Sequence, residues 1–125
     1  MQGTGRALDG RLIRLSSMTG GWHRNAHGAR DTVADRAQVR FAHTDGVHGA
    51  FATLQTDLSA AVDPHVIPPH ARFEIVDVGA RRADDRGSAI QDHHIDNYLG
   101  FGAAVVRTWL ARGITNKDVK FLAYR

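Results

Sequence analysis

Residues 84–98 read DDRGSAIQDHHIDNY, and residues 61–68 read AVDPHVIP. The two stretches set three aspartates, Asp63, Asp85 and Asp96, among apolar residues and turn formers. Acidic side chains are common in solvated turns, so an acidic cluster alone is weak evidence for a site. Here the apolar residues on both sides of the acids indicate a built site, and the search for function starts from these three side chains.

The cluster of acids suits proton transfer. Asp84, Asp85, Asp92 and Asp96 lie close together in the sequence, and two neighbouring carboxylates do not both ionise easily, so one pKa rises. A carboxylic acid that keeps its proton near neutral pH can protonate a glycosidic oxygen. Gly87 has no side chain, which allows the backbone to approach a ligand closely.

Short apolar runs separated by frequent glycines predict a mainly β fold. One alternating segment, 71–78, has the pattern of a buried strand. Residues 20–35 are rich in Gly, Asn, His and Asp and predict a loop. The predicted strands cover residues 11–16, 38–42, 50–54, 58–62, 71–78 and 119–124.

One helix is predicted over residues 101–112. Phe101, Val105 and Trp109 recur at a spacing of four residues, which places them on one apolar face. That face predicts packing against the core, with Trp109 as a core residue. Gly113 is well placed to end the helix. Many short strands and one late helix favour a small β-barrel.

The two quoted stretches resemble the three-aspartate, or 3D, domain, whose pattern runs roughly AVDPxxIPxG and then DxGGAIKGxxIDxY. This domain occurs in bacterial cell-wall enzymes, including membrane-bound lytic transglycosylase A and the stationary-phase-survival lytic transglycosylases. The resemblance covers residues 60–125. It implies a six-stranded double-psi β-barrel in which the third aspartate leads into a helix and a last strand.

The resemblance also implies an activity. In lytic transglycosylases of this type, the aspartate of the IDxY motif is the acid and base, which here is Asp96. It would cleave the bond between N-acetylmuramic acid and N-acetylglucosamine without water and leave a 1,6-anhydromuramyl end. Asp85 is expected to assist Asp96 as the second catalytic residue. The expected substrate-binding residues are Asp63, Gly87, Ser88, Ala89 and Tyr98.

Alternatives remain beside this interpretation. Asp63 also suits a structural hydrogen-bond hub, and Tyr98 suits a core position. Ser88 stands where the family has a second Gly, and residues 91–92 stand where Lys and Gly are usual. These departures favour a non-catalytic module that binds wall polysaccharide on the same barrel. A third hypothesis is an intracellular barrel with an unrelated ligand.

Composition narrows the partners. The chain has no cysteine, so disulfides and thiolate metal sites are excluded. The net charge is +3, without the basic block or aromatic-interleaved basic run of a nucleic-acid binder. His93 and His94 are adjacent and would point to opposite faces of a strand, which argues against a shared metal ion. We expect peptidoglycan strands as the partner, no nucleic acid, no cofactor and no metal.

Length and targeting complete the picture. A chain of 125 residues suits one domain, so a single 3D-type barrel over residues 1–125 is expected. No apolar run is long enough for a transmembrane segment. Residues 1–15 carry charges where a signal peptide needs an apolar stretch. The wall-enzyme hypothesis therefore predicts an extracytoplasmic protein that is either a mature fragment or a phage-type enzyme.

Overall fold

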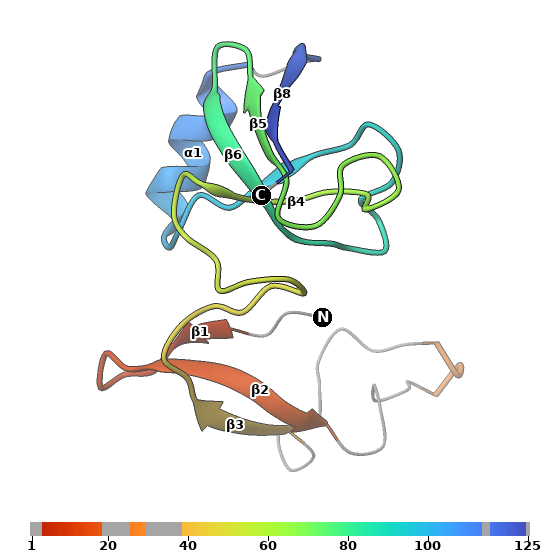
Figure 1. The fold of residues 1–125 in the computed structure, drawn as a ribbon. Helices are drawn as coiled ribbons and strands as arrows, with labels where there is room; N and C mark the ends of the chain where they lie inside the picture. The colour runs from red at the N-terminus through yellow and green to blue at the C-terminus, as the bar shows by residue number, and fades with distance from the viewer. Residues whose placement is uncertain (1–3, 19–25, 30–38, 114–115, 125) are drawn as a thin grey trace. The chain divides into compact units, whose positions relative to one another are not determined.

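The computed structural model describes residues 4–18, 26–29, 39–113 and 116–124 (Figure 1). The chain divides into two compact units, residues 1–47 and 48–125. In the described residues the elements are β-strands and one α-helix in the C-terminal half, which confirms the prediction of a mainly β chain with one late helix. One domain over residues 1–125 stays a prediction.

The first unit contains a three-stranded antiparallel sheet in the order β1-β2-β3. The predicted strands at 11–16 and 38–42 correspond to β2 and β3. The predicted loop at 20–35 lies largely outside the described residues, and residues 26–28 of it form a turn and bend. The strands are β1 (Thr4–Arg6), β2 (Leu12–Met18) and β3 (Val39–His43).

The second unit contains a five-stranded sheet in the order β7-β4-β6-β5-β8 (Figure 1). Only the β4–β6 pair is parallel, and the other pairs are antiparallel. Among the described residues β7 and β8 are the two edges, so the sheet is open and a closed six-stranded barrel is not confirmed. The strands are β4 (Ser59–Ala61), β5 (Arg72–Ile75), β6 (Gly79–Asp85), β7 (Asp96–Asn97) and β8 (Val119–Ala123).

Two strand predictions need correction, and one strand was missed. The strand predicted at 71–78 ends at Ile75, because the chain turns there, with Asp77 at φ 66° and Gly79 at φ 120°. Positive φ is available to Gly and tolerated by Asp, so this pair marks a turn. The strand predicted at 50–54 is wrong, since this segment makes only the isolated bridge between His48 and Thr53. Strand β6 was not predicted, because its buried positions include charged residues.

The core of the second unit lies around β4, β5 and β6. Phe73 is its largest fully buried side chain, and Val62 is also fully buried. Val78 and Ile95 pack against this cluster from outside. The remaining core residues are small or aliphatic: Ala60, Ile67, Ala71, Ile75 and Ala83.

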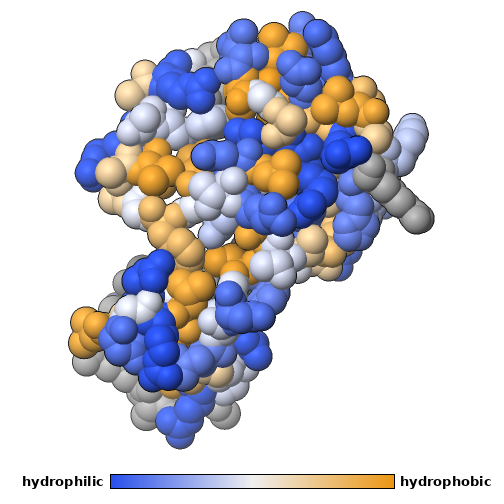
Figure 2. Space-filling view, turned by 60° about the vertical axis from the view of Figure 1, so that its left-hand side comes forward, coloured by the Kyte–Doolittle hydropathy of each residue, from blue (hydrophilic) through white to orange (hydrophobic). Residues whose placement is uncertain are grey.

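The helix α1 (Ala103–Ala111) confirms the predicted helix in place but not in packing. It contains no buried residue, and Phe101 and Val105 of the predicted apolar face are exposed. Trp109 is half-buried and lies against a cavity, so its prediction as a core residue is wrong. Apolar residues accordingly appear among hydrophilic ones on the surface of the second unit (Figure 2).

Phe73 and Phe121 form a matched pair for testing the core, because they are register partners on β5 and β8. Phe73 is 0% exposed and Phe121 is 50% exposed. Phe73→Ala should lower the free energy of unfolding by about 3–5 kcal/mol, since it removes a buried ring and leaves a cavity. Phe121→Ala should cost less than about 1 kcal/mol. Urea unfolding measures both, and equal losses would contradict this placement of the core.

Candidate functional site

Strand pairing brings the three motif aspartates to one end of the sheet, where β4 and β6 end and β7 begins. Ala61 ends β4, and it pairs with Asp85 at the end of β6 and with Asp96 at the start of β7. Asp85 and Asp96 therefore flank β4, with backbones roughly 10 Å apart at the usual strand spacing. Asp63 follows Ala61 by two residues. The structure thus gathers three predicted residues that lie far apart in the sequence.

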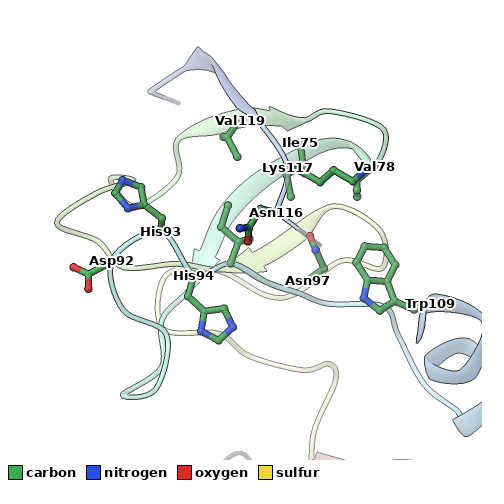
Figure 3. Close-up of a pocket in the computed structure, with 11 residues that line it drawn as sticks. Ile75, Val78, Asp92, His93, His94, Asn97, Trp109, Asn116, Lys117 and Val119 are labelled. Atoms are coloured by element: carbon green, nitrogen blue, oxygen red, sulfur yellow. The ribbon is translucent and has the colours of Figure 1, made fainter. Parts of the chain in front are cut away.

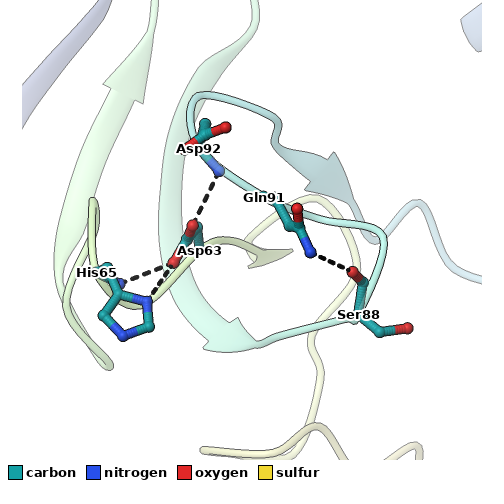
Figure 4. Close-up of polar contacts among 5 residues, drawn as sticks. All are labelled: Asp63, His65, Ser88, Gln91 and Asp92. Carbon is teal, nitrogen blue, oxygen red and sulfur yellow. Dashed lines mark hydrogen bonds and ion pairs between the residues drawn. The ribbon is translucent and has the colours of Figure 1, made fainter.

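Asp63 joins the turn after β4 to the loop before β7 (Figure 4). Its Oδ1 accepts the backbone N–H of His65 at 2.9 Å and lies 3.0 Å from Nδ1 of that residue. Its Oδ2 accepts the backbone N–H of Asp92 at 2.9 Å. These hydrogen bonds hold the pKa of the Asp63 carboxyl below its ordinary value. The bond from the His65 backbone has the largest effect, and the bond from the Asp92 backbone has the next largest.

These contacts are the ones expected of a structural hub. Asp63 anchors the loop that carries the predicted residues Gly87, Ser88 and Ala89, and substrate binding by Asp63 stays a prediction. In the loop, the N–H of Ile90 donates to the carbonyl of Gly87 at 3.0 Å. Ser88 and Ala89 are exposed at its tip, and the Ser88 carbonyl accepts the Gln91 side-chain amide at 3.0 Å (Figure 4).

Asp85 is 5% exposed, although the sequence indicates a substrate-facing residue. Its Oδ1 accepts the backbone N–H of Ala50 at 2.8 Å. Its carbonyl accepts the N–H of Val62 at 3.1 Å, next to Asp63. A buried carboxylate needs such donors to offset the loss of water. Asp85 is therefore tied to the backbone on two sides of the site.

Asp84, beside it, is fully buried and carries the strongest polar contacts of this region. Arg82 Nε lies 2.6 Å from its Oδ1 and Arg82 Nη2 lies 2.9 Å from its Oδ2. Ser59 Oγ donates to the same carboxylate. The hydrogen bond to Asp84 raises the pKa of Arg82. Asp84 is thus occupied by structural partners.

Asp96 differs from the other acids. It is exposed on β7, and its carboxylate has no hydrogen-bond or ion-pair partner among the residues that the structure describes. Tyr98, two residues on, is half-buried, and burial raises its pKa. The Tyr98 backbone bonds to Ser59 at 3.0 Å and to Asp57 at 3.1 Å, which fixes the end of β7. Of the three motif aspartates, Asp96 is the one open to a ligand.

Gly49 is a further residue of this region that the sequence did not predict. A Cβ at this position would lie 2.5 Å from the Asp84 carbonyl oxygen and 3.0 Å from Asp85 Cβ. The neighbouring N–H groups of Phe51 and Ala52 donate to that same carbonyl at 2.9 Å and 3.1 Å. The missing side chain lets residues 48–53 close over the end of β6. An isolated glycine between His48 and Ala50 was the available signal for such a close approach.

A cavity of about 680 Å³ lies beside this region (Figure 3). It is bounded by residues 92–95, by Asn97, by Trp109 near the end of α1 and by residues 116, 117 and 119. None of the three motif aspartates lines this cavity. Within the described parts of the chain, no group of three His, Cys, Asp or Glu side chains is arranged to hold a metal ion.

Comparison with known proteins places this site in a family. The model of the 3D domain matches residues 58–124, which covers strands β4 to β8. The chain belongs to the 3D domain family. A search of the curated proteins found no match.

Two solved structures resemble this member of the 3D domain family. One is the lytic transglycosylase LtgG of Burkholderia pseudomallei, with a TM-score of 0.54 and 21% identity over 95% of this chain and 49% of LtgG. The other is MltA of Neisseria gonorrhoeae, with a TM-score of 0.54 and 20% identity over 98% of this chain and 43% of MltA. The likeness shows a shared fold, and the chain spans about half of either protein. No helix in the described parts of the domain is long and apolar enough to cross a membrane.

The contacts of Asp63 predict a pH-dependent contribution to stability. A lowered pKa in the folded state means that the carboxylate stabilises the fold above its ordinary value of 3.8. This contribution is lost as the pH falls through the lowered pKa. Asp63→Asn should therefore be less stable than the parent at about pH 6, with the difference shrinking below pH 3.8. Urea unfolding across this pH range measures it.

Asp92→Asn is the matched control for Asp63→Asn. Asp92 supplies only its backbone N–H to this contact, and its side chain is exposed. It should track the parent at every pH. A gap between Asp63→Asn and the parent that persists unchanged below pH 3 would contradict the assignment.

Gly49→Ala tests the close approach over β6. The new Cβ would lie 2.5 Å from the Asp84 backbone oxygen, which yields little, and 2.7 Å from Leu54 Cδ2. The free energy of unfolding should therefore fall by roughly 1–3 kcal/mol. Gly5→Ala is the control, because a Cβ there meets nothing within 4 Å. Denaturant unfolding of both variants checks the expectation, and a neutral Gly49→Ala would show that this contact is loose.

Proposed function

We propose that the chain is the part of a peptidoglycan lytic transglycosylase that carries the acid and base, with Asp96 in that role. The observation that carries the proposal is the exposed carboxylate of Asp96, which has no partner among the described residues and lies at the end of the sheet where Asp63 and Asp85 also lie. Membership of the 3D domain family and the fold shared with LtgG support it.

The proposed reaction uses one carboxyl group twice. Protonated Asp96 donates its proton to the oxygen between N-acetylmuramic acid and N-acetylglucosamine as the bond from C1 to that oxygen breaks. The C6 hydroxyl of the muramic acid then attacks C1 and returns its proton to the Asp96 carboxylate. The product is a 1,6-anhydromuramyl end, and no water is consumed. Because a single group serves both steps, the paired-carboxylate spacing of ordinary glycosidases is not required.

In this reaction Asp85 is a positioning residue, which holds the strand beside Asp96 in place. A side chain that is 5% exposed has little surface to offer a sugar. Its contact with Ala50 and its pairing with Ala61 hold the strand next to Asp96.

The remaining site residues divide into two groups. Gly87, Ser88 and Ala89 form an exposed turn, which we propose contacts the glycan strand through its backbone. Asp63 holds the base of the loop that carries this turn. Tyr98 is half-buried, and we propose that its ring lies against a sugar at the edge of the site.

The fold and the cellular location of the protein follow from the same hypothesis. We propose that strands β4 to β8 belong to a double-psi barrel, for which the parallel β4–β6 pair and the shared fold with MltA and LtgG are the support. A peptidoglycan substrate places the protein outside the cytoplasm. Because the chain spans about half of LtgG, the activity of the whole protein includes whatever the other half supplies.

A non-catalytic wall-binding module on the same fold is the second candidate. The burial of Asp85 and the structural contacts of Asp63 favour it, since two of the three motif aspartates are engaged inside the protein. Such a module would bind the glycan strand and leave it intact.

Digestion of purified peptidoglycan separates the two candidates. The parent chain should release fragments with 1,6-anhydromuramyl ends, detected by mass spectrometry. Asp96→Asn should lose this activity by a factor of about 10² or more, because it removes the proton donor. Asp92→Asn, which alters an exposed acid on the neighbouring loop, should keep it. Fragments released equally by the parent and Asp96→Asn would refute the role of Asp96. Binding to the sacculus with no release by any form would favour the module.

A further inference from the structure

Two cavities in the second unit lie next to each other and share walls, and we treat them together as one groove. The cavity of about 680 Å³ and another of about 360 Å³ share His93, Ile95, Lys117 and Val119. Of these two cavities, the larger is lined by Trp109 and the smaller by Phe121, which is 50% exposed. The groove therefore runs between residues 92–97 and 116–119 and has an aromatic side chain in each part. This form suits an elongated ligand.

Asn97 gives the groove a fixed hydrogen-bond donor. Arg81 Nε lies 2.9 Å from the side-chain oxygen of Asn97. A guanidinium group donates hydrogen bonds and accepts none, so the oxygen must face Arg81. The Asn97 Nδ2 group is then turned the other way, and the residues that the structure describes supply no acceptor for its two N–H bonds. Asn97 lines the first cavity, close to Trp109 (Figure 3).

Arg81 holds this arrangement at an electrostatic cost. It is 5% exposed, and its three bonds in the described structure go to neutral acceptors: Asn97 Oδ1, the Asp57 carbonyl and the Ala80 carbonyl. Burial lowers its pKa. The nearby charge of Asp57 offsets part of this cost. The contact of Arg81 with Asn97 Oδ1 sets the orientation of that amide at the cavity wall.

The groove is separate from the end of the sheet that carries Asp63, Asp85 and Asp96. Successive side chains of a strand point to opposite faces, so Asn97 and Asp96 on β7 face apart. A ligand in the groove would therefore lie across β7 from the carboxylate assigned to catalysis. The larger cavity, about 680 Å³, lies in the range of small-ligand sites, and it combines apolar walls with a few polar groups.

We propose that this groove is a second glycan-binding site, which takes the acetamido sugars of a glycan strand. The apolar face of a sugar ring stacks on the side of the Trp109 indole opposite the Arg112 guanidinium, which lies 5.3 Å from the ring centroid. The Asn97 Nδ2 group donates to an acetamido carbonyl. The choice of ligand class rests on the proposed function, whereas the site itself rests on the groove and on the Arg81–Asn97 contact.

Binding of two matched oligosaccharides tests the site. The tetramer of N-acetylglucosamine carries acetamido groups, and cellotetraose has the same β-1,4 backbone without them. Isothermal titration calorimetry with the full chain should show tighter binding of the acetylated tetramer. Trp109→Leu should weaken it about tenfold or more, the equivalent of one lost aromatic contact. Asn97→Ala should remove the preference between the two ligands.

Two controls separate binding from folding. Leu110→Ala changes a helix residue that is 70% exposed and lines neither cavity, so its affinity should equal that of the parent. Trp22→Phe leaves Trp109 as the remaining tryptophan of the two in the chain, and its fluorescence should shift on addition of the acetylated tetramer. Unchanged affinity in Trp109→Leu, unchanged fluorescence, or equal binding of both tetramers would overturn the proposal.

Asp96→Asn distinguishes this site from the proposed activity. It should bind the acetylated tetramer as the parent does, because its side chain faces away from the groove. If peptidoglycan is cleaved and no tetramer binds, the groove proposal fails and the activity stands. If the tetramer binds in the groove and nothing is cleaved, the activity fails and the groove stands.

Discussion

The parallel pairing of β4 with β6 is the constraint on which the second unit depends. β6 also pairs with β5, and β5 with β8, while β7 pairs with the other side of β4. Every strand of this sheet is thus placed directly or indirectly by the β4–β6 register. That register sets Asp85 and Asp96 on either side of Ala61. Asp63, just beyond the end of β4, therefore lies at the same end of the sheet.

A buried polar network holds this pairing. The carboxylate of Asp84 on β6 accepts hydrogen bonds from Ser59 on β4 and from Arg82 on its own strand. Removing any one partner would leave a buried group unsatisfied, which costs more than the bond itself contributes. A shift of the strands by one residue would separate Ser59 from Asp84. The network therefore specifies the register more than it adds to stability, and the geometry of the site depends on it.

Sequence patterns predicted the elements that follow simple rules of burial. The strand around Phe73 alternates, and the helix before Gly113 has apolar spacing, so both were found. Strand β6 was missed because Arg81, Asp84 and Asp85 are buried through specific partners distant in the sequence, which periodicity does not reveal. The place of the site was predictable from its motifs, but the different surroundings of its three acids were not.

Those surroundings make the three acids chemically different. Hydrogen bonds to a carboxylate stabilise the charged form, so Asp63, which accepts backbone N–H groups from both sides, is a poor proton donor. Asp85 is buried under residues 48–53 and reaches little solvent. Asp96 is exposed, and its carboxylate has no partner among the residues that the structure describes. Of the three acids it is therefore the one that a ligand can reach without displacing a contact within the described protein.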